Sequence, residues 1–182
     1  EVVVNNEVSA QLKERYPYKV ILTLRGDNSV DSLFVFDGVP VVWDGITIPN
    51  CQIANNPKFA FNKNFFGAQL MHRFNFILDY GADEGNDLYI QPSKDFEQQR
   101  AKPVLSAFGV NIGEREQGII VHRLEPDGIA AKAGIALGDV VLELDGRAPK
   151  ASLASQDFIR YTADKKEIRL RIKGKGEMRL AL

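Results

Sequence analysis

The feature that most constrains the fold of this chain is residues 118–146, where strand, turn and helix signals follow one another without a gap. Residues 119–121 are consecutive β-branched residues, as a buried strand requires. Proline, aspartate and glycine at 126–128 form a turn signal. The alanine-rich run 130–133 favours a single helical turn, and Gly134 favours its end in the left-handed region.

Two further turns complete this segment. Gly138-Asp139 leads into the apolar strand expected at 140–144, and Asp145-Gly146 is a dipeptide typical of a two-residue hairpin. The order and spacing of these elements resemble the centre of a PDZ domain. The resemblance implies an α+β domain that binds extended peptides. Taken without the resemblance, the residues still predict strand, turn, short helix, turn and strand.

The composition is typical of a water-soluble globular protein and excludes some partners. The chain has 182 residues, of which 45% are hydrophobic and 26% charged, enough for one large or two small domains. A net charge of −1 gives no basis for binding nucleic acid or an anionic membrane surface. No apolar run approaches the roughly 20 residues of a membrane span. Since the chain begins with Glu1, we expect a processed or trimmed piece of a longer protein.

The first half has the sequence pattern of β-hairpins. Asn5, Asn6 and Ser9 are candidate caps of a short helix that ends at Arg15. Short strands separated by glycine turns then predict a small barrel or sandwich, and they are expected at 18–24, 33–36, 39–43 and 46–48.

A helix and a strand pair complete the first half. The helix is expected at 62–73, and the two strands are expected at 74–80 and 87–91. The charged, glutamine-rich stretch that follows predicts a domain boundary. The expected organisation is a first domain at 1–96, a linker at 97–102 and a second domain at 103–182.

Part of the first half resembles a retropepsin-like aspartic protease. The resemblance spans about residues 33–92 and rests on three stretches, 64–71, 73–80 and 87–92. Two phenylalanines and Gly67 lead into a short helix, an apolar strand ends in Asp-Tyr, and a strand with Leu-Tyr and a final proline follows. The implied fold is mainly β with few short helices: a partial acid-protease-like β-barrel followed by an α+β PDZ domain. Bacterial proteases of this kind with a C-terminal PDZ domain are a known arrangement.

The chain lacks the catalytic motif of that family. Aspartic proteases use two carboxylates that share one proton, each in an Asp-Thr-Gly or Asp-Ser-Gly loop. No such tripeptide occurs, and Asp31-Ser32 is followed by Leu33 where glycine is required. We therefore assign no catalytic residue. Two explanations remain open. Either the catalytic loop lies N-terminal to Glu1, or the chain belongs to a degenerate, inactive relative of the family.

Other chemistry has little basis in the residues. There is no Gly-x-Ser-x-Gly motif, and His72 and His122 are the only histidines. Neither lies in a zinc-binding spacing, so no metal and no cofactor are expected. Cys51 has no surrounding motif and is interpreted as a small buried residue rather than a nucleophile.

The peptide-binding site is expected where the second domain begins. In PDZ domains, an apolar-Gly-apolar loop receives a terminal carboxylate on its backbone amides, and the following strand pairs with the peptide. The matching loop is 107–110, and the helix that faces it is expected at 154–162. The final strands are expected at 168–172 and 178–182. With the loop at the start of the domain and this strand pair at its end, the order of elements resembles the bacterial, circularly permuted type of PDZ domain. The candidate peptide-binding residues are Ala107, Phe108, Gly109, Val110, Ile112, Phe158 and Tyr161. An alternative is that the apolar members of this set are core residues.

Two functions remain open from the sequence. The first is a fragment of an aspartic endopeptidase, inactive by itself, whose PDZ domain presents peptides or unfolded protein segments. The second is a non-enzymatic peptide-binding or assembly module with a degenerate protease-like domain. The resemblance also implies a bacterial periplasm or cell envelope, and it allows a homodimer, because one-lobed retropepsins dimerise to complete their aspartate pair.

Overall fold

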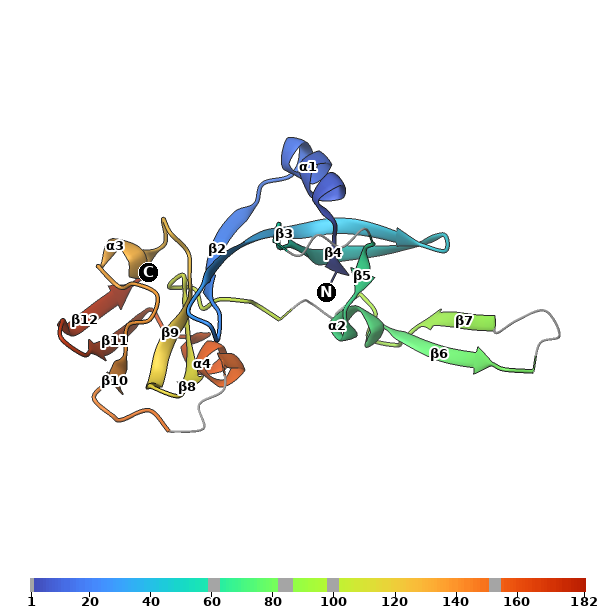
Figure 1. Cartoon of the computed structure of the whole chain (residues 1–182). Helices are drawn as coiled ribbons and strands as arrows, with labels where there is room; N and C mark the ends of the chain where they lie inside the picture. The colour runs from blue at the N-terminus through green and yellow to red at the C-terminus, as the bar shows by residue number, and fades with distance from the viewer. Residues whose placement is uncertain (1, 59–62, 82–86, 98–101, 151–154) are drawn as a thin grey trace. The chain divides into compact units, whose positions relative to one another are not determined.

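The chain divides into two compact units. The computed structural model describes residues 2–58, 63–81, 87–97, 102–150 and 155–182. One unit comprises residues 1–18 and 35–102, and the other comprises residues 19–34 and 103–182. The second unit therefore takes up a segment from the first half of the chain, and β3 (Val30–Trp43) contributes residues to both units. Figure 1 shows the elements of each unit.

The first unit contains two helices and short strands. Its helices are α1 (Asn6–Arg15) and α2 (Ala68–Met71). Besides the later part of β3, its strands are β1 (Val2–Val3), β4 (Ile46–Asn55), β5 (Phe65–Phe66), β6 (Phe74–Asp79) and β7 (Asp87–Pro92). Strand β1 pairs in parallel with β4 and antiparallel with β5, while β6 and β7 form a separate hairpin.

Local sequence signals set several boundaries in the first unit. Asn5 caps α1, because its side-chain oxygen accepts a hydrogen bond from the Val8 amide at 2.9 Å. Asp44 and Gly45 both have positive φ, 49° and 74°, as the turn between β3 and β4 requires. The expected cap and the expected hairpin turn are both confirmed.

Two sequence predictions in the first unit are wrong. The strands expected at 33–36 and 39–43 form the single strand β3, and Gly38 lies inside it with φ of 73°. A glycine with positive φ can bend a strand without ending it, so Asp37-Gly38 is not a turn. The helix expected at 62–73 is only the short α2, because Phe65 and Phe66 pair with β1 as strand β5. Position 62 lies outside the described residues.

An aromatic cluster and a buried arginine hold the first unit together. The Trp43 ring lies 4.8 Å from the Phe66 ring and 5.3 Å from the Phe74 ring, centroid to centroid. The side chain of Arg73 is fully buried and donates to the carbonyl oxygen of Pro49 at 2.8 Å. A buried guanidinium requires such partners, so this bond fixes the start of β6 against the chain near Pro49.

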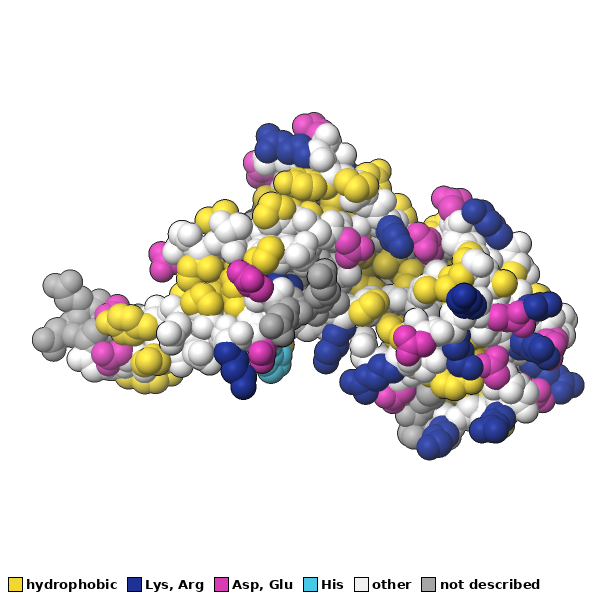
Figure 2. Space-filling view, turned by 180° about the vertical axis from the view of Figure 1, so that it is seen from behind, with side chains coloured by type: hydrophobic (Ala, Val, Ile, Leu, Met, Phe, Trp, Pro, Cys, Tyr) yellow, Lys and Arg dark blue, Asp and Glu magenta, His cyan; other side chains and the backbone are white. Residues whose placement is uncertain are grey.

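The β6–β7 hairpin exposes apolar side chains on both of its faces. Ile77 pairs across the strands with Tyr89, and Leu78 pairs with Leu88. All four are exposed, Ile77 at 67%. Figure 2 shows hydrophobic side chains along this hairpin. Monomeric proteins seldom expose such apolar pairs, so this hairpin is a candidate contact surface.

The second unit consists of two small sheets around one core. In one sheet, β9 (Gly118–Leu124) pairs with β8 (Val110–Arg115) on one side and with β2 (Lys19–Leu24) on the other. The other sheet has the order β10, β11, β12, formed by Val141–Leu144, Glu167–Ile172 and Gly176–Ala181. The helices are α3 (Ile129–Lys132) and α4 (Ser155–Thr162).

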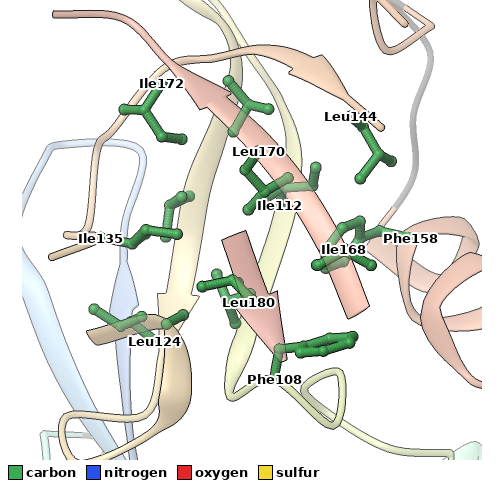
Figure 3. Packing of buried hydrophobic residues seen from close by; sticks show 14 of the residues in the cluster. Phe108, Ile112, Leu124, Ile135, Leu144, Phe158, Ile168, Leu170, Ile172 and Leu180 are labelled. Atoms are coloured by element: carbon green, nitrogen blue, oxygen red, sulfur yellow. The ribbon is translucent and has the colours of Figure 1, made fainter. Parts of the chain in front are cut away.

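The turns of the second unit agree with the sequence prediction. Gly134 follows α3 with φ of 90°. Asp145 and Gly146 have positive φ, and the flanking residues Leu144 and Arg147 exchange two backbone hydrogen bonds, as in a two-residue hairpin. The core between the sheets contains fifteen buried hydrophobic residues, several of which are labelled in Figure 3.

The predicted fold class is confirmed in part. The structure is mainly β with few short helices. Among the described residues, the strands of the first unit do not close into a barrel, so the expected retropepsin-like barrel is unconfirmed.

Candidate peptide-binding site

The loop before β8 is a closed turn held by its own hydrogen bonds. The Gly109 amide donates to the Ser106 carbonyl oxygen at 3.0 Å. The Ser106 amide and hydroxyl both donate to the Val110 carbonyl oxygen, at 3.1 and 2.7 Å. Gly109 has φ of 74°, and its carbonyl oxygen accepts from the Glu125 amide at 2.8 Å. The turn is therefore fixed to the end of β9.

A carboxylate and a second glycine crowd Gly109. A Cβ atom added at Gly109 would lie 3.1 Å from Oε2 of Glu125 and 3.2 Å from Cα of Gly128. The positive φ and the close neighbours both require glycine here. The Phe108 carbonyl oxygen accepts from the Ala130 amide at 3.0 Å, which joins the loop to α3.

Most candidate site residues lie in the core. Phe108, Val110, Ile112 and Phe158 have no exposed surface and belong to one buried cluster. Figure 3 shows Phe108 and Phe158 among the core residues of β8 and β11. Ala107 is exposed on the loop. These four apolar candidates therefore lie where the alternative reading of the sequence places them, among the core residues.

One edge of β8 is available for pairing. Within the part of the chain that the structure describes, β8 pairs only with β9 and ends its sheet. Helix α4 begins close to this strand: a Cβ atom at Gly113 would lie 3.1 Å from Oγ of Ser155. The Ser155 hydroxyl is also 2.7 Å from Nε2 of His122 on β9. Glycine at 113 thus permits the close approach of α4.

His122 is neutral at physiological pH. Burial, together with the charges of Arg123 and Arg115, lowers the pKa of its imidazole to about 4. A neutral imidazole has one donor and one acceptor nitrogen, so Nε2 can exchange a hydrogen bond with the Ser155 hydroxyl in either direction. This bond holds the start of α4 against the strand pair β8–β9.

Tyr161 faces a different part of the unit. Its hydroxyl donates to Oδ2 of Asp145 at 2.7 Å, and the Lys165 ammonium lies 4.3 Å from its ring centroid. Burial alone would raise the pKa of Asp145, but hydrogen bonds from Lys165, the Arg169 amide and Tyr161 outweigh it and lower the pKa. Tyr161 and Asp145 line a cavity of about 690 Å³ with residues 147–150.

Sequence reasoning missed three residues that shape the β8 edge. Ser155, Gly113 and His122 come together there, although they were not candidates. The four-residue spacing of Ser155 and Ile159 places both on one face of α4, and Tyr161 on another. This periodicity was the signal in the sequence that could have separated Tyr161 from the strand-facing residues.

The aspartate considered in the sequence has an arginine as its partner. Asp31 is buried in β3 and forms an ion pair with Arg25. Cys51 is fully buried in β4, as expected. Among the described residues, no three histidine, cysteine or acidic side chains are grouped as metal ligands require. No helix within them is long and apolar enough to cross a membrane.

Comparison with known families identifies the second half of the chain. The PDZ domain family model matches residues 106–181. Residues 106–181 form a PDZ domain. In this PDZ domain, β8 follows the loop expected to bind a carboxylate, and α4 is the helix beside it. The predicted PDZ domain is thus confirmed.

A protease relative contains a similar segment. The chain is 33% identical over 82 residues to a probable periplasmic serine endoprotease DegP-like from Halomonas elongata. The match covers 45% of this chain and 17% of that relative. The chain therefore corresponds to a small part of the relative.

A solved structure shows a weaker likeness. It is an HtrA-type protease AlgW with decapeptide, 13% identical, with a TM-score of 0.33 over 92% of this chain and 61% of that one. A TM-score this low supports no conclusion about the fold. The Halomonas elongata relative is named as a serine endoprotease, so the comparison with it gives no support to an aspartic protease.

Proposed function

We propose that the PDZ domain binds extended peptides or unfolded protein segments by adding a strand to β8. The observation that carries this proposal is the position of β8, which among the described strands is paired on one side only and has α4 next to it. An added strand gains backbone hydrogen bonds along β8, and side chains that alternate across it supply specificity.

The test is a selection followed by a binding map. A display library of random ten-residue peptides is selected against the full chain, and a selected peptide is titrated into the ¹⁵N-labelled protein. We expect amide shifts in Val110–Arg115 and Ser155–Thr162. Shifts confined to the cavity beside Tyr161 would contradict binding at β8.

A substitution can block the β8 edge. The Gly113→Val change places a branched side chain where a Cβ atom already approaches Ser155 at 3.1 Å and His122 at 3.4 Å. We expect the valine to displace α4 from beside β8, and peptide affinity to fall at least tenfold as a result. The loop and the strand register should stay in place. Gly26→Val, in the turn after β2 with no positive φ and no atom within 4 Å of its Cβ position, is the control for glycine replacement.

We further propose that the chain is part of a longer endopeptidase whose PDZ domain presents substrate. The support is the 33% identity of an 82-residue segment of the chain to a protein named as an endoprotease. The aspartic class rests on the sequence resemblance of residues 33–92 alone, and no residue here is assigned to catalysis. The alternative stays a non-enzymatic peptide-binding or assembly module.

The full gene product distinguishes these possibilities. Its sequence and intact mass, measured after purification with an inhibitor of aspartic enzymes, show whether an Asp-Thr-Gly or Asp-Ser-Gly loop precedes Glu1. A long form with that loop supports an aspartic protease. A long form with neither that loop nor any peptidase activity supports the non-enzymatic module.

A homodimer through the β6–β7 hairpin is the proposed assembly. Exposed apolar pairs such as Ile77 and Tyr89 favour self-association. Light scattering after size exclusion should give the dimer mass for the native chain and the monomer mass for Ile77→Lys with Tyr89→Lys. A monomer at all concentrations in the native chain would exclude the dimer.

A further inference from the structure

We infer that this PDZ domain takes internal extended segments rather than free C-termini, because the chain itself fills the end of the site where a terminal carboxylate would bind. The inference rests on the proposed peptide binding at β8 and specifies the class of ligand. Three features at the loop before β8 support it: a loop amide that is already hydrogen-bonded, a carboxylate beside the loop, and the burial of apolar side chains.

The first feature is the use of a loop amide. A terminal carboxylate in a PDZ domain is held by backbone N–H groups of this loop. The Gly109 amide already donates to the Ser106 carbonyl oxygen at 3.0 Å. Ser106 in turn is held by two hydrogen bonds to the Val110 carbonyl oxygen. Freeing the Gly109 amide for a carboxylate would therefore require opening this turn, at the cost of its hydrogen bonds.

The second feature is a carboxylate already beside the loop. Oε2 of Glu125 lies 3.1 Å from the Cβ position of Gly109 and 3.3 Å from that of Gly128. Residues 106–111 contain no lysine or arginine that could offset its charge. A carboxylate brought to the same loop would meet a like charge in a partly buried place, which disfavours its binding.

The third feature is that three of the candidate pocket residues, Phe108, Val110 and Phe158, are fully buried. A peptide that ends at the loop inserts its last side chain beside the apolar loop and helix residues. Phe108, Val110 and Phe158 have no exposed surface and pack within the core. A terminal side chain could contact them only by displacing core packing, which is costly in a close-packed interior.

An internal segment avoids all three costs. It pairs through its backbone with the free edge of β8 and continues past the loop without placing a charge or a terminal side chain there. Such a segment needs only an extended conformation. Unfolded or loop regions of proteins supply extended segments of this kind.

The experiment compares two libraries and then three forms of one peptide. Random ten-residue segments are displayed either with a free C-terminus or between two flanking linkers, and both libraries are selected against the full chain. One selected sequence is then synthesised as a free acid, as a carboxamide and with a Gly-Ser-Gly-Ser extension. Dissociation constants are measured by fluorescence anisotropy.

Two variants that each replace a glutamate with glutamine test the role of the Glu125 charge. Glu125→Gln keeps the side-chain shape and the backbone hydrogen bonds, and it should strengthen binding of the free acid about three- to tenfold relative to the carboxamide. Glu116→Gln makes the same charge change in the turn between β8 and β9, away from the loop. It should leave the ratio of the two affinities unchanged.

The outcomes separate this inference from the function on which it rests. Binders from the flanked library, with the carboxamide and extended forms at least as tight as the free acid, support it. Binders only from the free-terminus library, or a free acid that binds more than tenfold tighter than its carboxamide, overturn it while peptide binding stands. No binder from either library overturns the proposed function and the inference together.

Discussion

The two units differ in how they treat their apolar side chains. In the second unit, fifteen hydrophobic residues from both sheets and from both helices form one buried cluster. In the first unit, the aromatic cluster around Trp43 coexists with the hairpin β6–β7, where Ile77, Leu78, Leu88 and Tyr89 remain exposed. The difference teaches that the second unit, which contains the PDZ domain, buries its apolar side chains in a core of its own, whereas the hairpin of the first unit leaves apolar side chains exposed as a candidate contact surface.

The largest expected effect comes from the core of the second unit. Phe158→Ala removes a fully buried ring and should lower the free energy of unfolding by about 3–5 kcal/mol. Urea denaturation followed by far-ultraviolet circular dichroism measures this loss. Trp43, the single tryptophan, lies in the first unit and reports its unfolding separately by fluorescence. A loss below 1 kcal/mol would contradict a tightly packed core around Phe158.

The second effect depends on pH and is specific to the PDZ unit. The pKa of His122 is about 4 in the folded chain, below the ordinary value of 6.5, because of burial and the nearby arginines. The unfolded chain therefore binds more protons between these values, and stability is lost as pH falls from about 6.5 to about 4.

A variant isolates this histidine from other titrating groups. The loss should reach at most about 3 kcal/mol, and His122→Gln should remove that part of the pH dependence. Unfolding free energies at pH 7.0, 5.5 and 4.5 for both proteins give the difference. Equal pH dependence in the two proteins would show that His122 is not the group responsible.

Replacing one glycine in each unit with alanine compares how closely the two units pack around the backbone. Gly109 and Gly38 have nearly the same φ, 74° and 73°, but only Gly109 has atoms near its Cβ position. Gly38→Ala should cost about 1 kcal/mol from the backbone alone. Gly109→Ala should cost about 1–3 kcal/mol more, because Glu125 and Gly128 must move. Thermal denaturation of both variants measures the difference, and equal losses would contradict the crowding at Gly109.

The smallest effect is expected on the hairpin. Ile77→Ser changes a side chain that is 67% exposed, so the stability of the monomeric chain should change by less than about 0.5 kcal/mol. Denaturation at low protein concentration tests this. A loss above 2 kcal/mol would mean that Ile77 is buried in solution and would weaken the contrast between the units.

Much of the PDZ unit could be predicted because its signals are local. The turn at Asp145-Gly146, the left-handed Gly134 and the β-branched run in β9 each depend on residues adjacent in sequence. The strand β3 could not be predicted in the same way. Gly38 is compatible with a turn or with a bent strand, and the pairing of β3 with its sheet neighbours β2 and β4 selects the strand.

The candidate site shows the same limit. The motif around Gly109 was visible in the sequence, but the positions of its neighbours were not. Glu125 lies against the loop before β8 and Ser155 lies against β8 itself, both from later segments of the chain. The burial of Phe108 depends on the whole core. The position of Tyr161 was also not visible in the sequence. Its hydroxyl donates to Asp145, and both residues line the cavity.

By itself, the sequence determined the PDZ domain, the mainly β character and the turns, because these follow from local backbone preferences and residue order. Only the tertiary structure decided that β2, from the first half of the chain, pairs with β9 in the second unit. It also decided that Glu125 lies against Gly109 and that the hairpin β6–β7 stays exposed. The physical reason is that these features depend on contacts between residues far apart in sequence, which local preferences do not specify.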